Sequence, residues 1–93
     1  MFLEIVTPEA ILFSSEVTSV AVPGINGEFQ MLNNHAPIVS ILTKGTVKIE
    51  AKSNSVDEKF ADKFSKVEDG RLAFSINSGT LEMKDNKVII LAD

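Results

Sequence analysis

The sequence contains no cysteine, only one histidine, His35, and no lysine or arginine before Lys44. Without cysteine the chain has no disulfide bond and no thiolate metal site, and nothing in its composition points to an oxidising compartment. A lone histidine cannot bind zinc without further ligands, and no HxH or HExxH spacing is present. The stretch PGING lacks the spacing and the lysine of a phosphate-binding loop. We therefore expect no metal and no cofactor.

Long apolar runs are also missing. No stretch approaches the roughly 18 apolar residues that a membrane-spanning helix needs. The first residues, MFLEIVTPEAILF, have no basic start and carry Glu4 and Glu9, so they are not expected to be a signal peptide.

Positive charge is absent from the first 43 residues, which hold Glu4, Glu9, Glu16 and Glu28, and the net charge of the chain is −4. Nucleic acid and anionic lipid both select clustered lysine and arginine, so neither nucleic-acid binding nor direct lipid insertion is expected. An acidic half without bases suits a basic protein partner. The alternative is a solvated acidic face with no partner.

Alternating strands account for most of the chain. Its 93 residues are 44% hydrophobic and 24% charged, which is typical of one globular domain, here residues 1–93. TVKIEAK places Val47 and Ile49 on one face, and LAFSIN places Leu72, Phe74 and Ile76 on one face. LEMKDNKVIIL is typical of a hairpin that turns at Asp85-Asn86.

Short strands separated by frequent turn residues predict an all-β fold, a β-sandwich. The predicted core consists of Leu3, Ile5, Val20, Val22, Val47, Ile49, Leu72, Phe74, Ile76, Leu81, Met83, Val88 and Ile90.

The segment 53–70 departs from the strand pattern. Phe60, Phe64 and Val67 follow helical spacing, and Ser55 with Glu58 forms a capping box. These features predict a short amphipathic helix near 56–68 that packs on the sandwich. The alternative is a long hairpin between the flanking strands.

The stretch VPGINGEFQMLNNHAPIVSIL, residues 22–42, is rich in turn residues and holds His35. Catalysis would need a carboxylate or nucleophile beside His35, and neither Glu28 nor Ser40 lies at a known spacing. We therefore expect His35 to brace a turn or to contact a partner, and no residue to be catalytic. Met31 and Leu32 are expected in the core, and Phe29, in a glycine-flanked turn, at the surface.

This stretch resembles the epsilon subunit of F-type ATP synthase, through its GE pair, its HAP turn and the LAD ending of SGTLEMKDNKVIILAD. The first residues, LEIVTPEAILFSSEVTSVAVPG, resemble the first strands of that family. The resemblance covers nearly the whole chain except about 53–70, which is an insertion relative to many members.

The resemblance implies the N-terminal β-sandwich, of about ten strands, in a non-catalytic rotor subunit of the central stalk. There it would dock the gamma subunit to the polar loops of the membrane c-ring, contact the rest of the catalytic complex indirectly, and help couple proton transport to ATP synthesis. Its place would be peripheral, on the cytoplasmic face of the bacterial inner membrane. The partner-binding residues would be Glu28, Phe29, Gln30, Asn33, Asn34 and His35, which we call the lip.

Several features depart from the family. Gln30 and Asn34 stand where glycine is usual, and asparagine tolerates a left-handed backbone better than glutamine does. The chain ends at Asp93, so the C-terminal helical hairpin of typical members is not expected in it. A free-standing β-sandwich that binds a small ligand or peptide is the alternative function, and a hydrolase using His35 and Glu28 is a more distant one.

Overall fold

The structure, a computed structural model, describes residues 1–51, 62–66 and 70–93, and these residues form ten β-strands. The strands are β1 (Phe2–Val6), β2 (Ile11–Glu16), β3 (Ser19–Gly24), β4 (Gly27–Leu32), β5 (Ile38–Leu42), β6 (Gly45–Glu50), β7 (Ser65–Lys66), β8 (Leu72–Ile76), β9 (Gly79–Lys84) and β10 (Lys87–Ala92).

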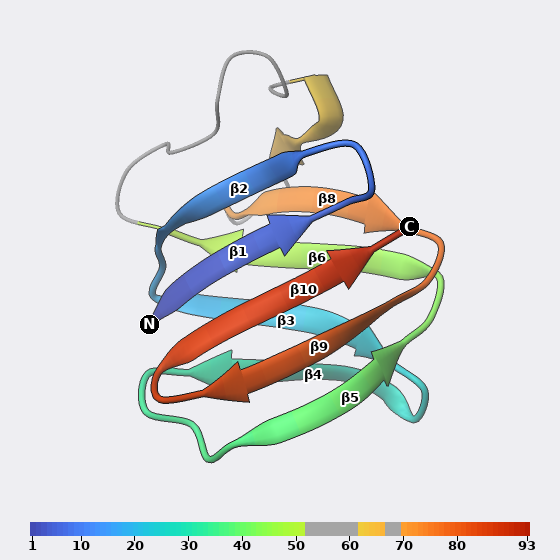
Figure 1. Cartoon of the computed structure of the whole chain (residues 1–93). Helices are drawn as coiled ribbons and strands as arrows, with labels where there is room; N and C mark the ends of the chain where they lie inside the picture. Colours follow the sequence, from blue (N-terminus) through green and yellow to red (C-terminus); the bar gives the residue numbers. More distant parts are fainter. Residues whose placement is uncertain (52–61, 67–69) are drawn as a thin grey trace.

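The strands form one sheet that curls into two facing layers (Figure 1). The first layer has the order β2-β1-β10-β9-β5, and the second contains β3, β6, β8 and β7, with β4 paired to the free side of β3. A single residue pair, Gly24 with Leu42, joins the layers between β3 and β5. Among the described strands β1 and β10 pair in parallel, and the other pairs are antiparallel. The predicted β-sandwich is confirmed.

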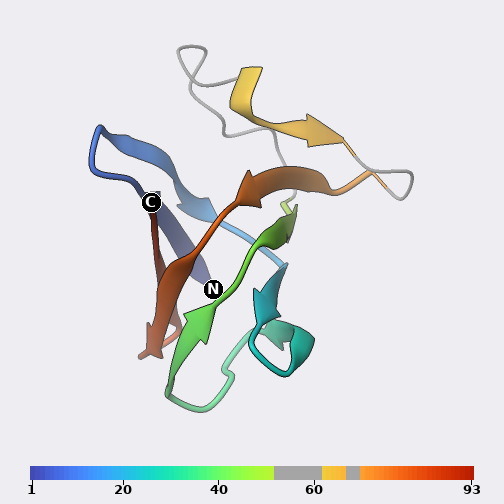
Figure 2. The ribbon, with the colours of Figure 1, turned by 90° about the vertical axis from the view of Figure 1, so that its right-hand side faces the viewer.

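Short corners carry the chain from one layer to the other. Figure 2 shows β5 continuing into β6, and β8 into β9, with little more than a bend between them. Residues 43–44 and 77–78 make these two corners. Strands that switch layers through a bend tie two packed sheets together covalently at their margins.

The core lies between the layers, and its members follow the predicted alternation. Every residue of the predicted core is buried except Leu72, which is half-buried and packs against the core. Met31 is buried as expected, whereas Leu32 is 57% exposed, because it alternates with Met31 along β4. Sequence reasoning missed several buried residues, namely Met1, Leu12, Phe13, Val17, Ala21, Leu42, Ala73 and Ala92.

The predicted hairpin at Asp85-Asn86 is confirmed. Lys84 pairs with Lys87, so two residues connect β9 to β10. Asp85 and Asn86 have φ angles of 52° and 60°. Two consecutive residues in the left-handed conformation form a tight hairpin turn whose twist matches that of the flanking strands. Asp and Asn adopt this conformation at low cost.

The predicted amphipathic helix near 56–68 is wrong where the structure describes that segment, since only residues 62 and 63 have helical backbone there, in a short 3₁₀ turn. Ser65 and Lys66 form β7 and pair with Ala73 and Leu72 of β8, which agrees with the hairpin alternative. Phe64 packs on the sandwich as predicted, and its ring centroid lies 5.2 Å from that of Phe74. The side chain therefore reaches the core without the predicted amphipathic helix. The other two residues of the stripe, at 60 and 67, lie outside the described residues. Among those described, no helix is long and apolar enough to cross a membrane.

The core assignment predicts a large effect of Ile49→Ala. Ile49 is fully buried in β6, so its truncation leaves a cavity and should lower the free energy of unfolding by about 2–5 kcal/mol. The matched control is Ile41→Ala, because Ile41 is 62% exposed and should cost less than about 1 kcal/mol. Chemical denaturation of both variants measures the difference. Equal costs would contradict the assignment of the two faces.

Candidate docking site

The first half of the lip lies in a strand, and not in a loop as the turn-rich sequence suggested. The β3–β4 hairpin turns at residues 25–26, where Gly24 pairs with Gly27, and Glu28 to Gln30 follow inside β4. Antiparallel pairing with β3 makes side chains alternate between the core and the solvent. Glu28 and Gln30 therefore point outward, and Phe29 points toward the core.

Phe29 is half-buried and packs against the core, so the expectation of a surface Phe29 is wrong. Its ring covers Gly24, where an added Cβ would lie 2.8 Å from a ring carbon. A larger residue at Gly24 would push the ring away, which explains the glycine at the end of β3. Gln30 is exposed and has no positive φ angle, so it stands in place of the family glycine without backbone strain.

The second half of the lip, Asn33 to His35, forms the exposed turn after β4. Asn34 adopts φ 63°, the left-handed conformation that asparagine tolerates. The backbone N–H of His35 donates to the carbonyl of Leu32 at 3.2 Å. The Nδ1 of His35 lies 2.7 Å from the carbonyl oxygen of Ala36, so Nδ1 carries the hydrogen, since a carbonyl can only accept. This contact is local bracing of the turn.

The structure does not bring the two halves of the lip together. Glu28 lies near the start of β4, and Asn33 follows its end. Five residue steps in a strand span roughly 16 Å. Glu28 and the turn from Asn33 to His35 therefore lie at opposite ends of β4, with Phe29 and Gln30 between them.

The same separation bears on chemistry. The ring of His35 bonds to the backbone, and Glu28 lies at the other end of the strand, so the two do not form an acid–base pair. In the described part of the chain, no group of three or more His, Cys, Asp or Glu side chains could hold a metal ion. We see no arrangement here that activates a nucleophile or a water.

Two lysines from later strands and the N-terminal amino group neutralise much of the acidic charge of the first 43 residues. Glu28 pairs with Lys48 at 3.2 Å and Glu4 with Lys87 at 3.0 Å. Glu16 pairs with the α-amino group of Met1 at 3.2 Å. The first 43 residues contain no lysine or arginine, but in the folded protein basic groups lie beside three of their four glutamates. Because the Glu28 side chain is half exposed, it still presents a carboxylate to solvent beside Lys48.

A second surface, not predicted from the sequence, covers the outside of the first layer. Apolar side chains of β5, β10, β1 and β2 point away from the core there, and we call this surface the outer apolar face. Its members are Val39, Ile41, Leu91, Ile89, Val6 and Ile11. Val39 is 77% exposed and Ile41 is 62% exposed.

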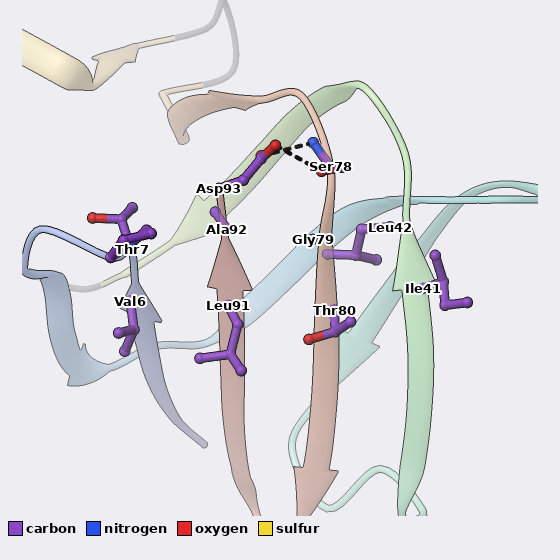
Figure 3. A pocket seen from close by; sticks show the side chains of 11 residues that line it. Val6, Thr7, Ile41, Leu42, Ser78, Gly79, Thr80, Leu91, Ala92 and Asp93 are labelled. Carbon is purple, nitrogen blue, oxygen red and sulfur yellow. Dashed lines mark hydrogen bonds between the residues drawn. The ribbon is translucent and has the colours of Figure 1, made fainter.

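Strand pairing makes the outer apolar face continuous. Ile41 pairs with Thr80, Thr80 with Leu91, Leu91 with Val6, and Val6 with Ile11, so one row crosses five strands. Figure 3 shows Val6, Leu91, Thr80 and Ile41 side by side on their strands.

An open hollow of about 680 Å³ lies at the corner end of this face. Asp93 closes that end of the hollow by accepting hydrogen bonds from the backbone N–H and the hydroxyl of Ser78, at 3.1 and 2.8 Å (Figure 3).

The sequence did carry a signal for this face. IVSIL in β5 and KVIILA in β10 are apolar at nearly every position, whereas TVKIEAK alternates. A strand that is apolar on both sides is expected to be covered on both sides. Contiguous exposed apolar surface on a small protein marks a contact site for another protein or a ligand.

The fold and these surfaces define a β-sandwich domain with an exposed apolar face and no catalytic arrangement among the described residues. Residues 1–63 match the family described as ATP synthase, Delta/Epsilon chain, beta-sandwich domain. The chain belongs to this family, which confirms the resemblance drawn from its GE pair, HAP turn and LAD ending.

Individual relatives agree with this assignment. The chain is 36% identical to the ATP synthase epsilon chain of Chlorobium limicola over 98% of its own length and 86% of that protein. It is 39% identical to the epsilon chain of Campylobacter curvus, over its whole length and 60% of that protein.

Two solved structures share the fold. One is the central stalk and c-ring of the Tetrahymena thermophila mitochondrial ATP synthase, with 16% sequence identity and a TM-score of 0.71. The other is the Euglena gracilis mitochondrial ATP synthase, with 19% sequence identity and a TM-score of 0.71. The match with the Tetrahymena structure covers 99% of this chain and 62% of the other chain. The match with the Euglena structure covers 97% of this chain and 48% of the other chain.

Neighbouring lip residues should differ in what they contribute to stability. Phe29→Ala removes a half-buried ring from the core margin and should lower the free energy of unfolding by about 1–3 kcal/mol. Gln30→Ala, one position along the same strand, should change it by less than about 0.5 kcal/mol. Thermal denaturation compares the two variants. A neutral Phe29→Ala would place the ring at the surface, as the sequence alone suggested.

Proposed function

We propose that this domain is a non-catalytic subunit of the central stalk of an ATP synthase. It docks the gamma subunit to the membrane c-ring and so helps couple proton transport to ATP synthesis. Residues 1–93 act as one β-sandwich domain in this role. The epsilon chains that resemble it, and the central-stalk structures that share its fold, support the proposal.

The outer apolar face is the observation that carries the proposal. A protein that exposes Val39, Ile41 and Leu91 on one face lowers its free energy by covering them, at about 25 cal/mol per Å² of apolar surface buried. We assign this face to the gamma subunit, because a rigid central-stalk partner needs an extended contact that keeps its orientation. A preformed sheet loses little conformational entropy on contact.

The lip is assigned to the polar loops of the c-ring and to the adjacent part of gamma. Cytoplasmic loops of membrane proteins are rich in lysine and arginine, and the exposed carboxylate of Glu28 attracts them. Because Lys48 offsets part of this charge, Glu28 contributes to orientation and encounter more than to affinity. The domain would then sit peripherally on the cytoplasmic face of the bacterial inner membrane.

Introducing a charge into the outer apolar face tests the proposal. Val39→Lys places an ammonium group where we expect gamma to pack, and burying it should weaken gamma binding by at least about tenfold. The melting temperature should hardly change, since Val39 is exposed. The readout is co-purification of the domain with gamma and the c-ring from detergent extracts. Ser75→Lys adds the same charge to an exposed position of the second layer and serves as the control.

Normal co-purification of the Val39→Lys variant would show that gamma does not bind this face. If the unsubstituted domain retains neither gamma nor the c-ring, the free-standing binding module becomes the better account. In that case the hollow beside Leu91 would be the place to look for its ligand.

The electrostatic role of the lip is tested by Glu28→Lys. The variant replaces attraction by repulsion and also sets two lysines side by side at Lys48. Assembly should weaken at low salt and recover partly at high salt, because salt screens exposed charges. Thermal stability should fall by no more than about 1 kcal/mol. Glu9→Lys changes the net charge equally and is the control, and identical assembly of both variants at low salt would refute the electrostatic account.

A further inference from the structure

The side chain of Asn86 connects the β9–β10 turn to the exposed turn of the lip. Its Nδ2 donates a hydrogen bond to Oδ1 of Asn33 at 3.0 Å. Its Oδ1 accepts a hydrogen bond from the backbone N–H of Asn34 at 2.8 Å. The turns are 52 and 53 residues apart in sequence, so one amide group joins two loops with no local connection. We call this pair of bonds the clasp.

The orientation of the amide follows from the chemistry of its partners. A backbone N–H can only donate, so the oxygen of Asn86 faces Asn34, and its nitrogen faces Asn33. Oδ1 of Asn33 accepts a second hydrogen bond from the α-amino group of Met1 at 2.8 Å. Both polar atoms of Asn86 thus hold the lip, and Asn33 is held from two sides.

Besides these bonds, only the two local contacts of His35 with Leu32 and Ala36 order the lip turn within the ranges that the structure describes. Residues 33–37 are all exposed, so burial of apolar surface does not fix their conformation. An exposed loop with few contacts opens at low free-energy cost. When such a loop binds a partner, the entropy lost in ordering it reduces the affinity, and a loop that is already held avoids this loss.

We infer that Asn86 is a positioning residue of the docking site, which holds Asn33, Asn34 and His35 in the conformation that meets the partner. The inference rests on the proposed docking role of the lip. Asn86 itself lies on a different hairpin, and it acts through the residues that it holds.

One substitution separates the backbone role of Asn86 from the role of its side chain. Asn86 has φ 60° in a two-residue turn, and glycine is favoured at this position of such turns. Its carbonyl accepts a hydrogen bond from the N–H of Phe2 at 3.0 Å, a contact that glycine retains. Asn86→Gly therefore removes the clasp while it preserves the hairpin.

The experiment compares amide hydrogen exchange and gamma–c-ring binding in three variants. In Asn86→Gly, exchange at Asn34 should accelerate roughly five- to tenfold, as expected for one lost hydrogen bond, at an unchanged melting temperature. Binding to the gamma–c-ring assembly should weaken roughly three- to tenfold. Asn86→Asp keeps an acceptor for Asn34 and should restore slow exchange there. Asp85→Asn, in the same turn, leaves the clasp intact and should behave as the unsubstituted protein.

Each departure from this pattern has one meaning. Unchanged exchange at Asn34 in Asn86→Gly overturns the inference, because the clasp then does not order the turn. Faster exchange with unchanged binding also overturns it, and if Val39→Lys still weakens binding, the proposed function stands. If the unsubstituted domain does not bind the gamma–c-ring assembly at all, the proposed function fails, and the inference that rests on it fails with it.

Discussion

The structure depends on the hydrophobic packing between its two layers. Each long strand buries the side chains of one of its sides against the facing layer. Leu3, Ile5, Val47 and Ile49 are fully covered by contacts across the sandwich. In so small a domain this single core has to offset the conformational entropy of nearly all the ordered residues. A single backbone pair, Gly24 with Leu42, joins β3 to β5, so side-chain packing and the covalent corners must keep the layers together.

This dependence explains why the two halves of the lip differ in character. Phe29 belongs to the core margin, and its neighbour Glu28 belongs to the surface, although they are adjacent in sequence. Asn34 and His35 lie beyond the strand, where no core contact reaches them. Their conformation depends on hydrogen bonds, from Leu32 and Ala36 nearby and from the distant β9–β10 turn.

Sequence reasoning was accurate wherever a local pattern decides the structure. The alternation in residues 46–52 and 71–77 placed Val47, Ile49 and Phe74 correctly, because one residue of register moves a side chain to the other face. The pair Asp85-Asn86 correctly predicted the turn between β9 and β10. Such a turn needs two residues with positive φ, and Asp and Asn are among the few residue types that adopt it at low cost. The segment after residue 53 misled us, since Phe64 packs on Phe74 although the residues that follow it, Ser65 and Lys66, form a strand and not a helix.

The features that could not be predicted from the sequence depend on which strands become neighbours in the sheet. The row from Ile41 to Ile11 exists only because β5, β9, β10, β1 and β2 lie in that order. The pairing of Glu28 with Lys48, and the bonds of Asn86 to Asn33 and Asn34, join residues from different hairpins. Periodicity says which side of a strand is buried, and it does not say which strand comes next.

The parallel pairing of β1 with β10 has a mechanical consequence for a domain proposed to turn with a rotor. Five residue pairs, from Phe2 with Lys87 to Val6 with Leu91, lie along this junction. A pull that draws Phe2 and Ala92 apart acts along the strands in opposite directions, so it shears these pairs. Sheared strands share the load among all their hydrogen bonds at once, whereas a peeled hairpin breaks them one at a time. Tension between the start of β1 and the end of β10 is therefore resisted by all five pairs of this junction together.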